Sequence, residues 1–108
     1  MGIVKTDVPM TAALCSETID ALVRAYPFCR SEVLTDTAFG RPMKTLVIGD
    51  GERQVLFTAA HHANEWITAP LLLKFVEELA AAMRGGGKLW GVDARTIGNL
   101  VTIHTVPM

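Results

Sequence analysis

The stretch TAAHHANEWITAP, residues 58–70, joins two different hydrophobic patterns. Residues 55–60 form a continuous apolar run, which favours a central strand covered on both faces. Residues 66–83 instead carry apolar side chains at helical spacing, and Pro70 lies near the start of this run, where its missing N–H is not needed. The buried face of that helix is expected to contain Leu72, Phe75, Val76 and Leu79. The stretch therefore marks a turn between a buried strand and a helix.

The residues after this helix predict a return to the same sheet. Gly85, Gly86 and Gly87 end the helix, and a short helical turn is expected at 93–97. Residues 100–106 are apolar and rich in β-branched side chains, which favours a strand. A strand, a helix and a second strand in this order form a right-handed βαβ unit.

The residues before the stretch predict another helix, at 11–26. Thr11 is a suitable N-cap, and Pro27 disfavours helical geometry at the residue before it. The apolar stripe of this helix consists of Cys15, Ile19, Leu22, Val23 and Tyr26.

Two strands are expected between the predicted helix and the quoted stretch. Residues 28–37 and 43–49 are joined by FGRP at 39–42, which favours an antiparallel hairpin, and Asp50-Gly51 marks a second tight turn. The predicted fold class is therefore α/β, with a mixed sheet flanked by helices in one domain over residues 1–108.

Composition and charge argue against several classes of function. The 10 basic and 11 acidic residues are well mixed and leave a net charge of −1, which argues against a nucleic-acid-binding face or a polybasic membrane patch. A hydrophobic content of 50% is high for so short a chain, so we expect the chain to associate or to belong to a larger core. No apolar run could cross a bilayer, and no signal-peptide h-region is visible, so the cytoplasm is the default expectation.

The two cysteines, Cys15 and Cys29, lie too far apart in the sequence for a metal-binding pair. A single disulfide is the alternative, but two buried free thiols in a reducing compartment are the expectation.

His62 and Glu65 are the candidate metal ligands. They follow the strand at 55–60, and open α/β sheets bind ligands beyond the carboxyl ends of their strands. Zinc binds imidazole nitrogen and carboxylate oxygen, and a catalytic zinc usually has three protein ligands and a water. The pair would supply two of the three. Without a metal, His62 is an ordinary turn histidine and Glu65 a helix-start residue favoured by the helix dipole.

Three neighbouring residues have simpler interpretations. His61 precedes His62 on an extended chain, so its side chain points to the opposite face and we expect a structural or supporting role. His104 is expected to be a core histidine with its hydrogen bonds satisfied. Trp66 is expected to be a packing residue.

The segment HHANEWITAPLLLKF resembles the zinc-binding segment of the zinc carboxypeptidase family, in which H-x-x-E-W-I-T opens the helix after a central strand. LVRAYPF, FGRPMKTLVIGDG and TIHTVPM resemble other segments of that family. Within it, VKTDVPMT and LWGVDARTIGNLVTIHTVPM are most similar to bacterial γ-D-glutamyl-L-diamino acid endopeptidases, which cut peptidoglycan stem peptides.

The resemblance implies a phosphorylase/hydrolase-like fold and roles for particular residues. His62 and Glu65 match the first two zinc ligands, and Asn64 stands where many carboxypeptidases have a substrate-binding arginine. The family's third ligand, a histidine, and its general-base glutamate have no counterpart here, and His104 is not the missing ligand. The expected cofactor is one zinc ion with an incomplete ligand set.

The chain is therefore expected to be the N-terminal portion of a zinc peptidase catalytic domain, truncated before the remaining active-site residues. A full-length form would act on peptides or peptidoglycan peptides, whereas this chain alone would be inactive. The alternative is a non-catalytic binding or assembly module that dimerises or pairs with a missing half. An exposed apolar edge strand at 100–106 would then support a homodimer.

Overall fold

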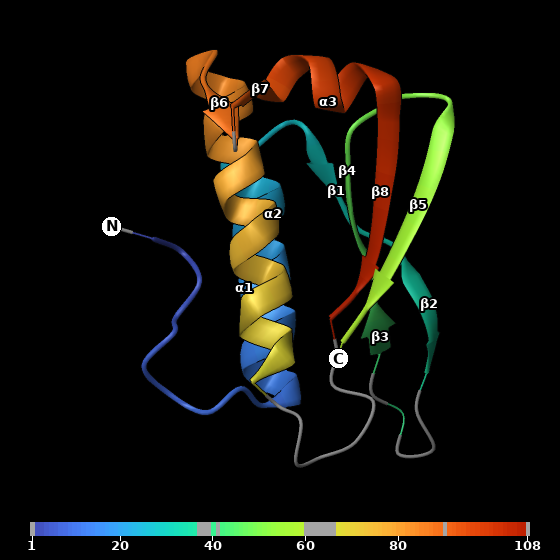
Figure 1. Cartoon of the computed structure of the whole chain (residues 1–108). Coiled ribbons are helices and arrows are strands. Elements are labelled where there is room, and N and C mark those ends of the chain that lie inside the picture. The colour runs from blue at the N-terminus through green and yellow to red at the C-terminus, as the bar shows by residue number, and fades with distance from the viewer. Residues whose placement is uncertain (1, 37–39, 41, 60–66, 90, 108) are drawn as a thin grey trace.

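The computed structural model describes residues 2–36, 40, 42–59, 67–89 and 91–107. Its helices and strands are, in chain order, α1 (Ala12–Ala25), β1 (Cys29–Arg30), β2 (Val33–Asp36), β3 (Pro42–Lys44), β4 (Leu46–Ile48), β5 (Arg53–Thr58), α2 (Thr68–Gly85), β6 (Lys88–Leu89), β7 (Val92–Asp93), α3 (Ala94–Leu100) and β8 (Val101–Val106). The main sheet has the order β1–β4–β8–β5, and the long helices α1 and α2 lie together on one side of it (Figure 1). The predicted α/β class with a mixed sheet is confirmed.

Helix α1 agrees with its predicted range and cap. The Thr11 hydroxyl accepts a hydrogen bond from the Leu14 N–H at 3.1 Å, and the N–H of Tyr26 donates to the Leu22 carbonyl at 2.9 Å as the chain turns extended. The buried residues of α1 are Cys15, Thr18, Ile19 and Leu22. Val23 and Tyr26, predicted on the same stripe, are half-buried at its margin.

The predicted hairpin is confirmed, but it forms in two sections. Strand β1 pairs antiparallel with β4, and β2 pairs antiparallel with β3. Between the sections, the Thr45 N–H donates to the Glu32 carbonyl at 2.8 Å, and the Thr45 hydroxyl accepts from the Glu32 N–H at 3.1 Å. This interruption leaves only the β1–β4 section in the main sheet.

Strand β8 lies inside the main sheet and pairs with two neighbours. It runs antiparallel to β4, with Val47 opposite His104, and parallel to β5, with Val55 opposite Ile103. The parallel β5–α2–β8 arrangement is therefore confirmed. The prediction that residues 100–106 form an exposed edge strand is wrong, because both sides of β8 are paired.

The prediction that residues 55–60 form a covered central strand is also wrong for this chain. Strand β5 ends the sheet order, and every side chain in it except that of Val55 is exposed. An apolar run shows that a strand is suited to burial, but the chain must also provide something to cover it. Among the described residues, β8 is the strand neighbour of β5, and Phe75 of α2 meets Phe57 on one face.

The Asp50-Gly51 segment was predicted to be a tight turn, but it is a link that crosses the start of β8. The Asp50 N–H donates to the Gly98 carbonyl at 2.9 Å, and the Gly51 N–H donates to the Val101 carbonyl at 3.2 Å. A Cβ atom on Gly51 would lie 2.0 Å from the carbonyl carbon of Leu100. Only glycine allows the two backbones to approach so closely.

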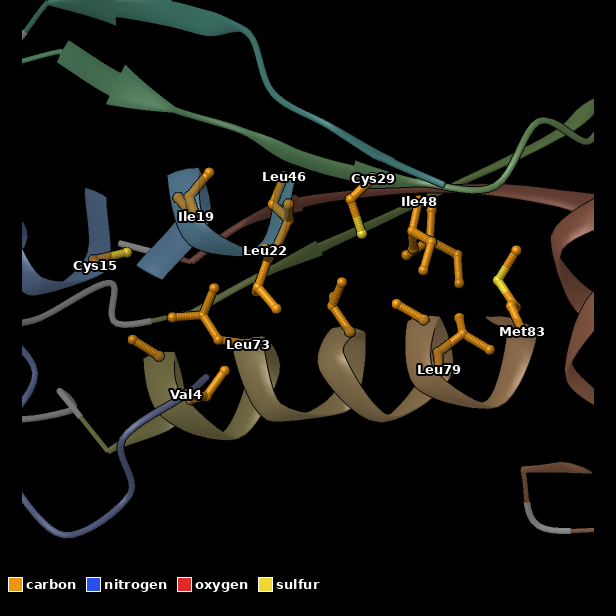
Figure 2. Packing of buried hydrophobic residues seen from close by; sticks show 14 of the residues in the cluster. Val4, Cys15, Ile19, Leu22, Cys29, Leu46, Ile48, Leu73, Leu79 and Met83 are labelled. Carbon is orange, nitrogen blue, oxygen red and sulfur yellow. The ribbon is translucent and has the colours of Figure 1, made fainter. Parts of the chain in front are cut away.

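The core lies between the two long helices and the sheet. Figure 2 shows Leu22 of α1, Leu46 of β4 and Leu73 of α2 pointing into the same space, and none of them is measurably exposed. The predicted α2 face is only partly right. Val76 and Leu79 are buried as expected, whereas Leu72 and Phe75 are half-buried, and Leu73, Ala80 and Met83 complete the buried face instead.

Helix α2 ends at the predicted glycines. Gly86 adopts a left-handed conformation with φ of 69°, and the Gly87 N–H donates to the Ala82 carbonyl at 2.8 Å. Arg84 donates to the Ala25 carbonyl and lies 4.3 Å over the Tyr26 ring, which ties the ends of the two long helices together. The predicted helical turn at 93–97 is confirmed as part of α3. The β6–β7 ribbon before α3 was not predicted.

A buried carboxylate attaches the N-terminal segment to α2. Glu77 accepts hydrogen bonds from the Ile3 N–H, from the Val4 N–H at 3.2 Å and from Lys74 Nζ at 3.0 Å. Burial alone would raise the pKa of Glu77, but these three donors outweigh it and lower the pKa below its ordinary value of 4.5.

We predict that Gly51→Ala destabilises the chain by about 1–3 kcal/mol, because the added methyl group overlaps the backbone of Leu100. Gly85→Ala is the matched control. A Cβ there meets nothing within 4 Å, so the same change should stabilise α2 by roughly 0.5–1 kcal/mol. Urea unfolding measures both, and equal effects of the two changes would contradict the close approach.

We predict that Glu77→Gln lowers the free energy of unfolding at neutral pH by about 1–3 kcal/mol. Because the folded pKa of Glu77 is depressed, its contribution is complete above the ordinary glutamate pKa and is lost as the pH falls through the lowered value. The difference between the two proteins should therefore shrink in acid. The exposed neighbour Glu78, changed to Gln, is the control. A Glu77→Gln deficit that stayed constant from neutral to strongly acidic pH would contradict this.

Candidate functional site

The predicted site residues lie in residues 60–66, outside the described part of the chain. They are His61, His62, Asn64, Glu65 and Trp66. The structure describes the two elements that border them, β5 before and α2 after. The roles of these residues therefore stay predictions. The end of β5 and the start of α2 show where the segment leaves the described fold and where it returns.

Strand β5 ends at the carboxyl edge of the sheet, beside the end of β8. The two strands are parallel, so their carboxyl ends lie at the same edge (Figure 1). Thr58 is in register with Val106, and the Ala59 N–H donates to the Val106 carbonyl at 3.1 Å. The segment with the predicted ligands leaves the sheet at this edge, where open α/β sheets bind ligands.

Helix α2 begins immediately after the segment. Ile67 already has helical geometry and its carbonyl accepts from the Leu71 N–H at 3.4 Å, but its side chain makes no capping hydrogen bond. The start of α2 carries no acidic residue of its own. The partial positive charge of a helix N-terminus favours a carboxylate in the residues just before it, which suits Glu65.

His104 is half-buried on the face of β8 that points away from the helices, rather than in the core as predicted. Its Nε2 lies 2.6 Å from Oε1 of Gln54. The Gln54 amide nitrogen donates to the Gly51 and Glu52 carbonyls, so Oε1 must accept and the His104 Nε2 carries the hydrogen. The prediction is therefore right only for Nε2, which is occupied by this contact.

Cys15 and Cys29 are buried free thiols, as predicted. Burial raises the pKa of each to about 11, so both are neutral at ordinary pH and are poor metal ligands or nucleophiles. Within the described ranges, no three His, Cys, Asp or Glu side chains come close enough together to hold a metal ion.

An apolar hollow of about 640 Å³ lies between the end of β5 and the first turns of α2. We call it the β5–α2 hollow. It is lined by Phe57, Thr58, Ala59, Thr68, Leu71, Leu72, Lys74, Phe75 and Glu78. The rings of Phe57 and Phe75 meet edge to face there, with centroids 6.2 Å apart. Ala59 and Thr68, on either side of the segment with the predicted ligands, both line this hollow.

A second hollow, of about 360 Å³, is lined in part by Arg30, Gly49 and Arg95, near the start of β8. Its arginines are occupied with main-chain carbonyls: Arg30 donates to Gly49 at 2.9 Å, and Arg95 donates to Met83 at 2.8 Å. These residues hold the end of β4 and cap the end of α2. Their role is structural.

No helix in the described part of the chain is long and apolar enough to cross a membrane.

The model of the zinc carboxypeptidase family matches residues 15–108. The chain is 30% identical over 90 residues to γ-D-glutamyl-L-diamino acid endopeptidase 1 of Lysinibacillus sphaericus, a match that covers 83% of this chain and 23% of the relative. A solved metallo-carboxypeptidase from Burkholderia cenocepacia is 28% identical, with a TM-score of 0.70 over 92% of this chain and 26% of that one.

Thrombin activatable fibrinolysis inhibitor is similar in fold alone, with 16% identity and a TM-score of 0.79 over 95% of this chain and 26% of that one. The chain spans about a quarter of the length of these relatives. The family match contains every element from within α1 to β8, and with them the segment of the predicted ligands. The chain belongs to the zinc carboxypeptidase family.

Proposed function

We propose that this chain supplies His62 and Glu65 as two zinc ligands of a metallopeptidase. The observation that carries the proposal is the place of their segment, which follows β5 at the carboxyl edge of the sheet and precedes α2. The family match, which spans this segment, supports the same assignment.

The chemistry of the pair fits zinc, but the pair is incomplete. One imidazole nitrogen and one carboxylate oxygen are zinc donors, and catalytic sites usually have three protein ligands. The histidine that the family uses as its third ligand has no counterpart in this sequence, and His104 has its Nε2 on Gln54. In a complete site, zinc would lower the pKa of a bound water and polarise the scissile carbonyl. The proposed role of this chain is to hold and orient the zinc ion.

Asn64 sets the proposed substrate class. A neutral amide can hydrogen-bond a peptide, but it cannot form the ion pair that an arginine makes with a C-terminal carboxylate. The site therefore suits cleavage away from a free C-terminus. The relative in Lysinibacillus sphaericus is named an endopeptidase for γ-D-glutamyl-L-diamino acid bonds. We propose peptidoglycan stem peptides as the substrates of the complete enzyme.

The 108-residue chain alone is proposed to be inactive. The family's third zinc ligand and general base have no counterpart in its sequence, and removing catalytic groups that act as a unit abolishes most of the rate. An assembly module is the second candidate function, and the exposed apolar side chains of Leu56 and Leu71 favour it.

Zinc titration by calorimetry tests the two-ligand site. We expect binding weaker than ~0.1 µM, the weak end for structural zinc sites with a full ligand set. His62→Ala and Glu65→Ala should each weaken it by at least about tenfold, because each removes a direct ligand. His61→Ala is the matched neighbour and should weaken it less.

Two results would contradict the incomplete site. One is tight one-to-one zinc binding by the 108-residue chain. The other is hydrolysis of a γ-D-glutamyl-L-diamino acid peptide by this chain that a chelator and Glu65→Ala both abolish.

A further inference from the structure

The N-terminal segment lies against the long helices without being part of any helix or strand. Residues 2–10 form a coil on the side of the helices that faces away from the sheet (Figure 1). Val4 and Met10 are buried in the core cluster, whereas residues 5–9 are exposed. We call residues 2–9 the N-terminal strap. Because the strap belongs to no helix or strand, no regular ladder of main-chain hydrogen bonds holds it in place.

The carboxylate of Glu77 holds the strap by its main chain. Its Oε2 accepts a hydrogen bond from the Ile3 N–H, and its Oε1 accepts one from the Val4 N–H at 3.2 Å. Lys74 Nζ donates to the same Oε1 at 3.0 Å. Glu77 is only 5% exposed. Hydrogen bonds to an ionised group are stronger than those between neutral groups, so the attachment of the strap depends on the charge of Glu77.

Lys74 is the charged side chain that Glu77 meets in the described part of the chain. Asp20 of α1 is instead bound to Lys44. The other charged residues of the strap and of the two long helices are exposed: Lys5, Asp7, Glu17, Arg24, Glu78 and Arg84. Lysine keeps its charge throughout the acid range, so Glu77 is the group at this contact whose charge changes there.

Protonation of Glu77 works against the attached strap. A protonated carboxyl has lost its charge and turns one oxygen into a hydroxyl donor, so it accepts the two amides less strongly. The three donors lower the pKa of Glu77, which means that attachment of the strap favours the charged form. The stabilisation of the strap is therefore complete above the ordinary pKa of 4.5 and is lost as the pH falls through the lowered value.

The strap also borders the start of α2, directly after the segment with the predicted ligands. A small hollow of about 270 Å³ lies there, lined by Thr6, Ile67, Thr68, Pro70, Leu71 and Lys74. Thr6 belongs to the strap, and the other lining residues belong to the beginning of α2 or directly precede it. Release of the strap would therefore remove one wall of this hollow.

We propose that the N-terminal strap is a pH-sensitive device: the charged carboxylate of Glu77 holds Ile3 and Val4 against α2, and protonation of Glu77 releases the strap while α2 and the main sheet stay folded. Met10, which is buried shortly before α1, is the point about which the strap turns. Val4 leaves the core on release, and the surface beside the start of α2 opens. This proposal does not rest on zinc binding or on peptidase activity.

Amide hydrogen exchange, resolved by NMR from neutral pH into acid, tests the proposal on the 108-residue chain. Each exchange rate is compared with that of the same amide in an unfolded peptide at the same pH. The Ile3 and Val4 amides should be protected at neutral pH. Their opening should increase by up to about tenfold per pH unit below the ordinary pKa of Glu77, and it should level off once Glu77 is protonated. The Leu79 and Ala80 amides, inside α2, are the internal control and should keep their protection.

Three variants test the role of the carboxylate. Glu77→Gln should release the strap at neutral pH, because glutamine has a single acceptor oxygen and turns a donor NH₂ group toward the second amide. Glu78→Gln is the matched control on the exposed face of α2 and should leave the protection unchanged. Lys74→Gln should keep the strap attached at neutral pH but raise the pH at which it opens, because Lys74 lowers the pKa of Glu77. Circular dichroism checks that every variant stays folded.

Four outcomes would overturn the proposal. One is exchange of the Ile3 and Val4 amides at neutral pH as fast as in an unfolded peptide. The second is protection of these amides that stays constant while Glu77 titrates. The third is a simultaneous loss of protection in the strap and in α2, which would mean that acid unfolds the whole chain. The fourth is a Glu77→Gln variant whose strap amides are as well protected as those of the parent chain.

Discussion

The whole sheet depends on one contact between two stretches of backbone. The link from β4 to β5 passes against the start of β8, so that Gly51 lies directly over Leu100 and its N–H donates to Val101. This contact exists because two strands that follow each other in the sequence are separated in the sheet by a third. A side chain at Gly51 would force the link outward and remove the main-chain donors that hold the beginning of β8.

The position of the candidate site follows from that order. Because β8 lies parallel to β5, the chain must return across the sheet between them, and α2 provides the crossing. Both strands then end at the same edge, and the segment with His62 and Glu65 leaves β5 there. The core beneath α2 and the carboxylate of Glu77 hold the helix that follows the segment. The fold thus fixes the strand before and the helix after the segment that contains the proposed ligands.

Local patterns predicted the elements well, and contacts between elements less well. Features that depend on neighbours in the sequence were predicted correctly. They are the N-cap and the main apolar stripe of α1, the glycines that end α2, and the strand β8. Residues 71–73 are all leucine, so the hydrophobic pattern could not decide which of them packs inward. In the structure, Leu73 is the one that is buried against the core. The two-residue strands β6 and β7 are too short to show a period. The exposure of β5 depends on what covers it, which its own residues do not encode. The prediction of the metal ligands rests on their spacing and on family resemblance, because their segment lies outside the described residues.

The central place of β8 also has a consequence for how the chain folds. The Thr105 hydroxyl donates to the Leu46 carbonyl across 59 residues of sequence, and β8, which lies between β4 and β5, is synthesised after both of them. While the chain grows on the ribosome, β4 and β5 have no native neighbour between them, and both present unpaired backbone. Such non-local pairing is slow and leaves the nascent chain prone to aggregation. The main sheet can therefore close only once β8 has been synthesised, and chaperones that shield apolar strands should affect the yield of folded protein.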